Sequence, residues 1–434
     1  MSAPVPVPRV QEASTACPAL DPWAITAPSE WTTGRETASS LAGTLAGMRM
    51  EAVLPEWATW NVDPDLEPWT VGVEEEVMLL EPDGSPAWRS EDVLEVLPAS
   101  LVEHTRGETH GLALELATDP HRRVHEATAQ LRRLRAGLAE AVHGLGLRAA
   151  VAGTHPMVRA EDVQVSPGAR YQYLHASLRE LARREPTFAL HVHVAVPDPQ
   201  LALRAFNGMR AHIPVLLALA ANSPFTRGRD SGLASARTPV FQAFPRTGIP
   251  REFATYADYA EAVDVLLRCG AIPEPTFIWW DVRLQPKLGT IEVRVMDAQT
   301  RIRDTAALVA LVQCLVRIEA LQGMAEPELT HAPEVLDENR FLAARDGIRA
   351  QLLDPRRDRC VPASGRLATL VDACWPHARA LGCERELRLL AHLAGDPGAD
   401  RQRAIASEPE GIAGLVRTLE GEFSPPRPQL AAAA

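Results

Sequence analysis

Lysine is almost absent from this sequence, and its absence excludes several common ATP-binding motifs. Lys287 is the only lysine in 434 residues, so arginine supplies nearly all of the positive charge. A P-loop needs the pattern Gly-x-x-x-x-Gly-Lys, which does not occur, and the dinucleotide pattern Gly-x-Gly-x-x-Gly is missing too. A Schiff-base or kinase-type mechanism would therefore have to depend on Lys287 alone.

Cysteine is also sparse, and apolar runs are short. None of the six cysteines forms a Cys-x-x-Cys pair, which argues against a zinc site or a disulfide framework. The first residues lack the basic and apolar regions of a secretory signal. No apolar run reaches the 18 residues of a membrane span. We therefore expect a cytoplasmic protein.

Acidic residues outnumber basic ones, and this excess limits the classes of partner that we expect. The formal net charge is −12, and this argues against nucleic acid or an anionic membrane surface as the main partner. Small-molecule substrates are the expected partners, and a homo-oligomer is left open.

Residues 1–66 are rich in Pro, Ala, Ser and Thr, so we expect a disordered extension there. Residues 67–423 should form a single domain with a helical C-terminal part, followed by a disordered tail over 424–434.

Residues 70–80 carry three consecutive acids within a strand pattern. Apolar residues bracket Glu74, Glu75 and Glu76, and Glu-Pro-Asp-Gly follows, which predicts a β-strand closed by a turn. Side chains alternate along a strand, so Glu74 and Glu76 share one face while Glu75 points to the other. Two neighbouring carboxylates raise each other's pKa, and carboxylate oxygens suit hard cations such as Mg²⁺. The pattern indicates a magnesium site; the alternative is a solvated edge strand.

A second strand pattern carries another acid. Over residues 112–117 leucines alternate with alanines and Glu115, which predicts a strand with Glu115 on one face. Asp119 and Pro120 then match an N-cap followed by proline at the first helical position. Apolar residues at three- and four-residue spacing predict an amphipathic helix over 124–142.

A third strand pattern, over residues 189–196, carries His191 and His193 on one face and valines on the other. Such a pair can bind a metal or contact a substrate; the alternative is two histidines on a polar sheet face. A helical stretch over 201–222 leads to a polar loop that contains Arg227 and Arg229, and Arg237 follows. Arginine binds phosphate and carboxylate bidentately; the alternative is a solvated loop.

A hairpin pattern follows, with strands over residues 278–283 and 290–297 and a turn between them. Glu292 and Arg294 share one face of the second strand, while apolar residues fill the other. This is typical of a sheet with one side on a core and the other facing a cleft; the alternative is a surface salt bridge. The rest of the chain is mostly helical, with a long helix over 305–321 and shorter helices punctuated by Pro355, Pro362, Pro376 and Pro397.

The order of these motifs resembles the glutamate–cysteine ligases, and most closely their bacterial carboxylate–amine ligase branch. The pieces that carry the resemblance are TVGVEEE (70–76), GTHP (153–156), LHVHV (190–194), ANSPFTRGRD (221–230), WWDVR (279–283) and GTIEVRV (289–295). The resemblance covers about residues 69–419. One departure is Leu112-Ala113, where the relatives usually show Ser-Gln, and this leaves the identity of the substrate open.

The resemblance implies a fold and a reaction. The fold is glutamine-synthetase-like, an α+β architecture in which a curved, mostly antiparallel sheet is backed by helices. The concave face of the sheet holds ATP and two or three Mg²⁺ ions. ATP phosphorylates the side-chain carboxylate of glutamate, and the amine of a second amino acid, such as cysteine, displaces phosphate to form an amide. Catalysis of this kind depends on positioning and on neutralising the phosphoryl charge.

The resemblance also implies roles for individual residues. Arg237 and Arg294 are the expected catalytic residues, which bind phosphate oxygens or the glutamate carboxylate. His193 and Arg229 are the expected substrate contacts. The expected metal ligands are Glu74, Glu76, Glu108, Glu115, His191 and Glu292.

Three functions remain open from the sequence. The first is an ATP-dependent ligase that uses glutamate as the acyl donor. The second is the same chemistry on other substrates in a specialised biosynthetic pathway. The third is a phosphotransferase of the related guanidino-kinase type, which stops at phosphoryl transfer. Formation of a new amide would separate the two ligases from the kinase.

Overall fold

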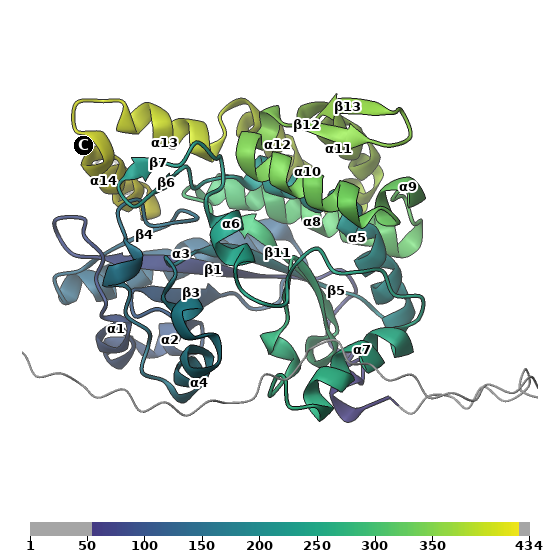
Figure 1. Ribbon diagram of the computed structural model, residues 1–434, viewed down its shortest axis with the longest axis horizontal. Helices are drawn as coiled ribbons and strands as arrows, with labels where there is room; N and C mark the ends of the chain where they lie inside the picture. Colours follow the sequence, from purple (N-terminus) through teal and green to yellow (C-terminus); the bar gives the residue numbers. More distant parts are fainter. Residues whose placement is uncertain (1–53, 425–434) are drawn as a thin grey trace, which may run out of the picture. The chain divides into compact units, whose positions relative to one another are not determined.

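The structure is a computed structural model, and it describes residues 54–424. The disorder expected for residues 1–53 and 425–434 lies outside the described residues. The described part contains one large sheet, three two-stranded sheets and a set of helices (Figure 1). The expected α+β class with a mostly antiparallel sheet is confirmed.

The large sheet has seven strands, and all of its pairings are antiparallel. The strand order is β10-β11-β5-β1-β3-β2, and β4 also pairs with β1. Its strands are β1 (Val71–Leu80), β2 (Thr105–Gly107), β3 (Ala113–Ala117), β4 (Arg148–Ala150), β5 (Ala189–Ala195), β10 (Val282–Gln285) and β11 (Thr290–Asp297). The small sheets pair β6 (Phe225–Thr226) with β7 (Arg229–Asp230), β8 (Thr247–Gly248) with β9 (Trp279–Trp280), and β12 (Gln351–Asp354) with β13 (Arg359–Pro362).

Helices occupy most of the remaining chain. They are α1 (Ser90–Val96), α2 (Ala99–Val102), α3 (Val124–Gly144), α4 (Ala169–Leu178), α5 (Pro199–Ala220), α6 (Arg237–Gln242), α7 (Tyr256–Arg268), α8 (Ile302–Leu321), α9 (Pro327–Thr330), α10 (Pro333–Asp346), α11 (Ala363–Leu381), α12 (Glu384–Gly395), α13 (Gly398–Ala406) and α14 (Gly411–Phe423). Among these, no helix is both long enough and apolar enough to cross a membrane.

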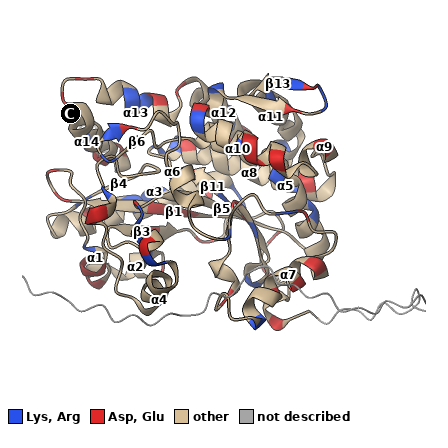
Figure 2. Ribbon diagram, in the orientation of Figure 1, with Lys and Arg blue, Asp and Glu red and all other residues tan. Residues whose placement is uncertain are grey.

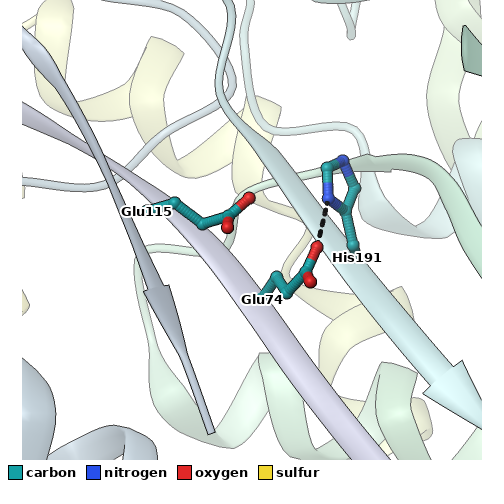
Figure 3. A group of neighbouring side chains, drawn as sticks. All are labelled: Glu74, Glu115 and His191. Carbon is teal, nitrogen blue, oxygen red and sulfur yellow. Dashed lines mark hydrogen bonds and ion pairs between the residues drawn. The ribbon is translucent and has the colours of Figure 1, made fainter. Parts of the chain in front are cut away.

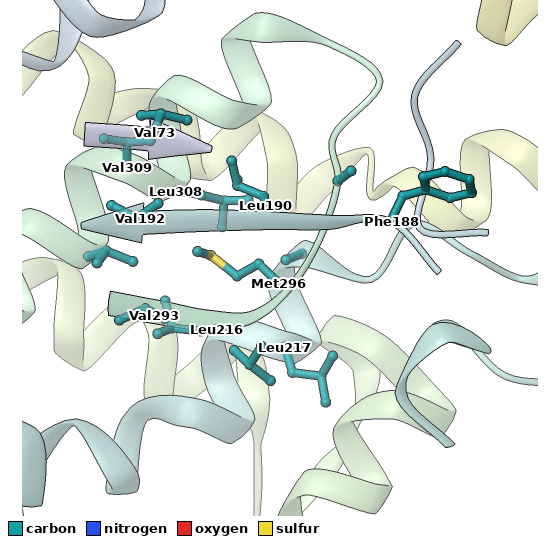
Figure 4. Close-up of a cluster of buried hydrophobic side chains, with 14 of the residues drawn as sticks. Val73, Phe188, Leu190, Val192, Leu216, Leu217, Val293, Met296, Leu308 and Val309 are labelled. Atoms are coloured by element: carbon teal, nitrogen blue, oxygen red, sulfur yellow. The ribbon is translucent and has the colours of Figure 1, made fainter. Parts of the chain in front are cut away.

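One face of the sheet is covered by α5 and α8, most of whose residues are buried. Valines, leucines and Met296 from β1, β5 and β11 pack there against leucines and a valine of the two helices (Figure 4). A helix that is apolar on nearly every side is stable only when it is buried on nearly every side. The opposite face of the sheet is therefore left for the charged residues of the same strands.

A buried ion pair connects β1 to α3. Glu75 points away from Glu74 and Glu76, and Arg135 of α3 donates to its two carboxylate oxygens over 2.6 and 2.7 Å. Both side chains are essentially inaccessible, at 0% and 1% exposure. Arg135 also donates to the backbone carbonyls of Gln299 and Thr300, which follow β11. One guanidinium thus connects α3, β1 and the end of β11.

The start of α3 differs from the sequence prediction. Asp119 and Pro120 do not cap the helix, which begins at Val124 after the N-cap residue Arg123. The intervening residues are extended, because His121 exchanges two backbone hydrogen bonds with Val71 at the start of β1. The Asp119 carboxylate instead accepts a bond from the side chain of Gln130.

The C-terminal region contains two further differences. Pro376 lies inside α11 and does not end it, whereas Pro355, Pro362 and Pro397 do lie outside the helices. The hairpin of β12 and β13 stands in a region that was predicted to be helical. Short strands of four residues give too few alternating positions to be recognised by pattern alone.

Residues 54–66 belong to the folded part, so the boundary expected after residue 66 does not match the packing. The Trp57 indole donates to the carboxylate of Asp264 in α7, and the Trp60 indole donates to the carbonyl of Val196. The carbonyl of Asn61 lies 2.0 Å from where a Cβ on Gly289 would be, and Gly289 also has a positive φ of 63°. Glycine at this turn therefore makes room for the segment.

We expect Arg135→Leu to lower the free energy of unfolding by about 3–5 kcal/mol, because it leaves Glu75 buried without a partner. Adding Glu75→Met should recover most of that loss. Urea denaturation followed by circular dichroism measures both effects. The matched control is Arg89→Ala, which breaks an exposed pair with Asp92 and should cost at most about 1 kcal/mol. Similar losses from Arg135→Leu and Arg89→Ala would contradict the structural role of the buried pair.

Candidate active site

The open face of the large sheet gathers acidic and imidazole side chains from neighbouring strands. Glu74 and Glu76 share this face because side chains alternate along β1. The register places Glu76 opposite Glu115 of β3, and Glu74 opposite His191 of β5. Acidic residues therefore gather along β1 and β3 at the centre of the sheet (Figure 2). Residues far apart in the sequence become neighbours through strand pairing.

Three overlapping groups of side chains bring their ligand atoms within 4.8 Å of one another. The first is Glu74 with Glu115 and His191 (Figure 3). The others are Glu74, His193 and Glu292, and then Glu76, Glu108 and Glu115. Glu74 and Glu115 each belong to two groups. The structure thus brings together all six residues that the sequence predicted as metal ligands.

The two histidines are held in fixed orientations. His191 Nδ1 lies 3.1 Å from Glu74 Oε2. His193 Nδ1 lies 3.0 Å from Thr290 Oγ1, and its Nε2 lies 3.4 Å from Glu74 Oε1. Burial lowers the pKa of His191 to about 4, and nearby Arg294 contributes in the same direction. His191 is therefore neutral at physiological pH, which is the form that binds a metal.

The carboxylates crowd one another in a half-buried site. Burial raises the pKa of Glu76 to about 8, and the charge of Glu108 adds to the effect. Burial also raises the pKa of Glu108, and it raises the pKa of Glu115 well above the ordinary value together with repulsion from the neighbouring acids. Glu74 differs, because His193 and His191 more than offset the effect of burial and hold its pKa well below the usual range.

Arginines bound the acidic groups on the side of β10 and β11. Arg283 and Arg294 both pair with Glu292. Burial acts to raise the pKa of Glu292, but the two arginines outweigh it and lower that pKa. Arg237, at the start of α6, donates to the carbonyls of Val295 and Arg294 over 3.0 and 3.1 Å. These bonds hold its guanidinium beside the strand that carries Glu292.

Two guanidinium N–H groups beside the acidic groups remain without a partner among the described residues. The Nε atoms of Arg237 and Arg294 are buried, and neither donates a hydrogen bond to any group within residues 54–424. A buried donor without an acceptor costs free energy, so each is suited to an anionic group that enters the site. Phosphate and carboxylate oxygens have that chemistry.

Several residues that support the site were not predicted as site residues. Asp297, at the end of β11, accepts hydrogen bonds from the hydroxyls of Ser223 and Ser235 and from the backbone N–H of Asn222. A Cβ on Gly153 would lie 2.6 Å from the Asp297 carboxyl carbon, so only glycine fits there. Asn222 and Ser223 stand within the quoted loop ANSPFTRGRD, and Arg283 ends the quoted piece WWDVR. These quoted pieces were the only feature of the sequence that pointed to the supporting residues.

Arg229 is the one expected site residue that lies apart from these groups. It stands on the exposed hairpin of β6 and β7. Its neighbour Arg227 pairs with Glu185, and Asp230 pairs with Arg403. No contact between Arg229 and the acidic groups occurs among the described residues. Its role as a substrate contact stays a prediction.

The donor set fits a hard divalent cation. Five glutamates supply carboxylate oxygens, and at three of them, Glu76, Glu108 and Glu115, burial together with repulsion between neighbouring acids disfavours the ionised form. A bound cation reverses that balance, because it favours the ionised carboxylates. Mg²⁺ takes oxygen ligands and keeps part of its water shell, so it suits groups that each offer only a few protein ligands.

Comparison with known proteins shows which family this chain is similar to. A family model described as glutamate–cysteine ligase family 2 matches residues 70–420. A protein of Rubrobacter xylanophilus, provisionally named glutamate–cysteine ligase 2-1, is 41% identical over 339 residues, covering 78% of this chain and 90% of that protein. A second protein of the same organism, provisionally named glutamate–cysteine ligase 2-3, is 40% identical over 355 residues, covering 81% of this chain and 96% of that protein.

Solved structures agree on the fold. The glutamate–cysteine ligase of Francisella tularensis, determined in complex with AMP, superposes with a TM-score of 0.62 at 14% identity. The match covers 83% of this chain and 90% of that protein. The bifunctional glutathione synthetase of Pasteurella multocida has the same TM-score and identity, over 82% of this chain and 52% of that protein. This chain therefore belongs to glutamate–cysteine ligase family 2 and is an ATP-dependent carboxylate–amine ligase.

Proposed function

We propose that this ligase joins the side-chain carboxylate of glutamate to the amine of an amino acid such as cysteine, through an acyl phosphate. The observation that carries the proposal is the meeting of three carboxylate-rich groups with Arg237 and Arg294, each of which has a buried Nε–H without a partner among the described residues. Phosphoryl transfer from ATP needs cations and donors around the phosphate. The amine then displaces phosphate from the acyl phosphate, and the amide forms.

We also propose Mg²⁺ as the metal. Glu74, Glu115 and His191 would hold one ion, and Glu76 and Glu108 would share Glu115 in a neighbouring position. Glu292 and His193 would extend the cluster towards the arginines. The bound metal supplies charge neutralisation for the phosphate oxygens during transfer.

The residues of the chain orient and bind the reacting groups. Arg237 and Arg294 would donate their free Nε–H groups to a phosphate or to the carboxylate of the acyl donor. The backbone carbonyls that Arg237 holds keep its guanidinium in one orientation. His193 lies between Glu74 and Glu292, where it can contact the substrate. Preorganised donors of this kind lower the barrier without reorganising during the reaction.

The experiment that tests the proposal is a screen of amino acids with purified protein, ATP, Mg²⁺ and glutamate. ADP release that requires both glutamate and an added amine, with a new amide detected by mass spectrometry, is the expected result. Omission of the amine serves as the control. If an amide forms with another carboxylic acid but not with glutamate, that acid is the acyl donor, and the assignment of glutamate is wrong. Steady ADP release without any amide would indicate a phosphotransferase and contradict the ligase reaction.

We expect the protein without divalent cations to lose stability as the pH rises, and Glu76→Gln to weaken that loss. The folded protein raises the pKa of Glu76 from 4.5 to about 8, so the protonated form favours folding. This contribution is complete below pH 4.5 and is lost as the pH rises through about 8. Thermal unfolding between pH 5 and 9 measures it.

In the Glu76→Gln variant, turnover at saturating Mg²⁺ should fall about a hundredfold or more. Full activity of this variant would contradict the role of Glu76 as a metal ligand.

Arg294→Lys should reduce kcat/KM about a hundredfold, which corresponds to roughly 3 kcal/mol. Lysine keeps the positive charge but loses the planar fork of donors. Arg301→Lys is the matched control. Arg301 donates to both carboxylate oxygens of Glu422 in a half-buried pair, and this pair lies outside the acidic groups. Steady-state kinetics should show less than about a fivefold change for that control. A similarly small change for Arg294→Lys would indicate that Arg294 only pairs with Glu292.

A further inference from the structure

The two carboxylate oxygens of Glu292 have different surroundings. Oε2 accepts hydrogen bonds from Nε of Arg283 and from Nε2 of Gln285, each over 2.8 Å, and Nη2 of Arg283 lies 2.8 Å from the same oxygen as an ion-pair contact. Oε1 faces Arg294, and it lies 4.0 Å from His191 Nδ1 and 4.0 Å from His193 Nε2. One oxygen is thus fully occupied by side chains of β10, and the other is directed to the acidic groups.

The pairing of β10 with β11 explains why these donors converge. Arg283 stands directly opposite Glu292 in the register, and Gln285 lies two residues further along the same face of β10. Arg283 is itself anchored, because its Nη1 donates to the carbonyls of Thr276 and Ile278 over 3.0 and 2.9 Å. Its guanidinium therefore holds one position and can act as a fixed support for Glu292.

The geometry is more specific than an ordinary ion pair requires. An arginine that only neutralises a carboxylate commonly binds both oxygens with its parallel N–H groups. Here Nε and Nη2 of Arg283 both lie 2.8 Å from Oε2, and Gln285 donates to the same oxygen. This arrangement prevents the carboxylate from rotating. It leaves a lone pair of Oε1 available beside His193 and Glu74, which form one of the three groups with Glu292.

We infer that Arg283 and Gln285 are positioning residues that orient Glu292 so that Oε1 can bind the divalent cation. The inference rests on the proposed function, because it assigns Glu292 to the metal cluster. In this role Arg283 and Gln285 act through Glu292, to which both side chains bind. Donors that orient a ligating carboxylate strengthen metal binding, and their loss typically weakens it about 10–100-fold.

The test measures Mn²⁺ binding directly, in purified protein without ATP, from the electron paramagnetic resonance signal of free Mn²⁺. Gln285→Met removes one donor at similar size, and Arg283→Lys removes the convergent fork. We expect each variant to weaken Mn²⁺ binding about tenfold, while its thermal unfolding shows that it is folded. The matched control is Arg246→Lys, because Arg246 donates to the carbonyl of Phe277 in the same loop but makes no contact with Glu292. Its Mn²⁺ affinity should be unchanged.

The outcomes separate this inference from the proposed function. If the unaltered protein binds Mn²⁺ and both variants match it within about twofold, the positioning role is overturned while the metal site stands. If Arg246→Lys weakens binding as much as Arg283→Lys, the effect comes from the loop and the inference is likewise overturned. If the unaltered protein binds no Mn²⁺, the proposed metal site fails, and the inference fails with it.

Discussion

Repulsion between carboxylates on one face of the sheet is the constraint on which the rest of this structure depends. Glu76, Glu108 and Glu115 bring ligand atoms within 4.8 Å of one another, and burial disfavours their charged forms. Such a group stores an unfavourable electrostatic energy that protons or cations must relieve. The fold has to supply enough stability elsewhere to keep the acids together.

That stability comes from the opposite face of the same strands. The apolar side chains of β1, β5 and β11 pack against α5 and α8 (Figure 4), and most residues of these two helices are buried. The buried pair of Glu75 and Arg135 joins α3 to β1, between the two acids that face the site. Alternation along the strand therefore separates the two tasks: one face carries the chemistry, and the other carries the packing.

The arginines complete the electrostatic arrangement. Arg283 and Arg294 neutralise Glu292, whereas Glu76, Glu108 and Glu115 have no comparable arginine in hydrogen-bonding contact within the described residues. The site thus has an acidic end suited to cations and a basic end suited to phosphate or carboxylate. Hydrogen bonds from Ser223 and Ser235 to Asp297 fix the end of β11. They hold the basic end in place relative to α6, which carries Arg237.

The sequence by itself determined which side chains share a face. Alternation within a single strand is local, so it correctly grouped Glu74 with Glu76, His191 with His193, and Glu292 with Arg294. The order of the motifs also identified the family, which the match over residues 70–420 confirms. The start of α3 was wrong, because extended pairing of His121 with Val71 displaced the expected cap.

Only the tertiary structure decided which of these faces meet. β5 lies between β1 and β11, and this order brings His193 between Glu74 and Glu292. The partners Arg135 for Glu75, and Gln285 for Glu292, are likewise set by helix packing and strand register. Strand order and register depend on contacts between segments far apart in the chain, and a local pattern of alternating residues contains no information about them.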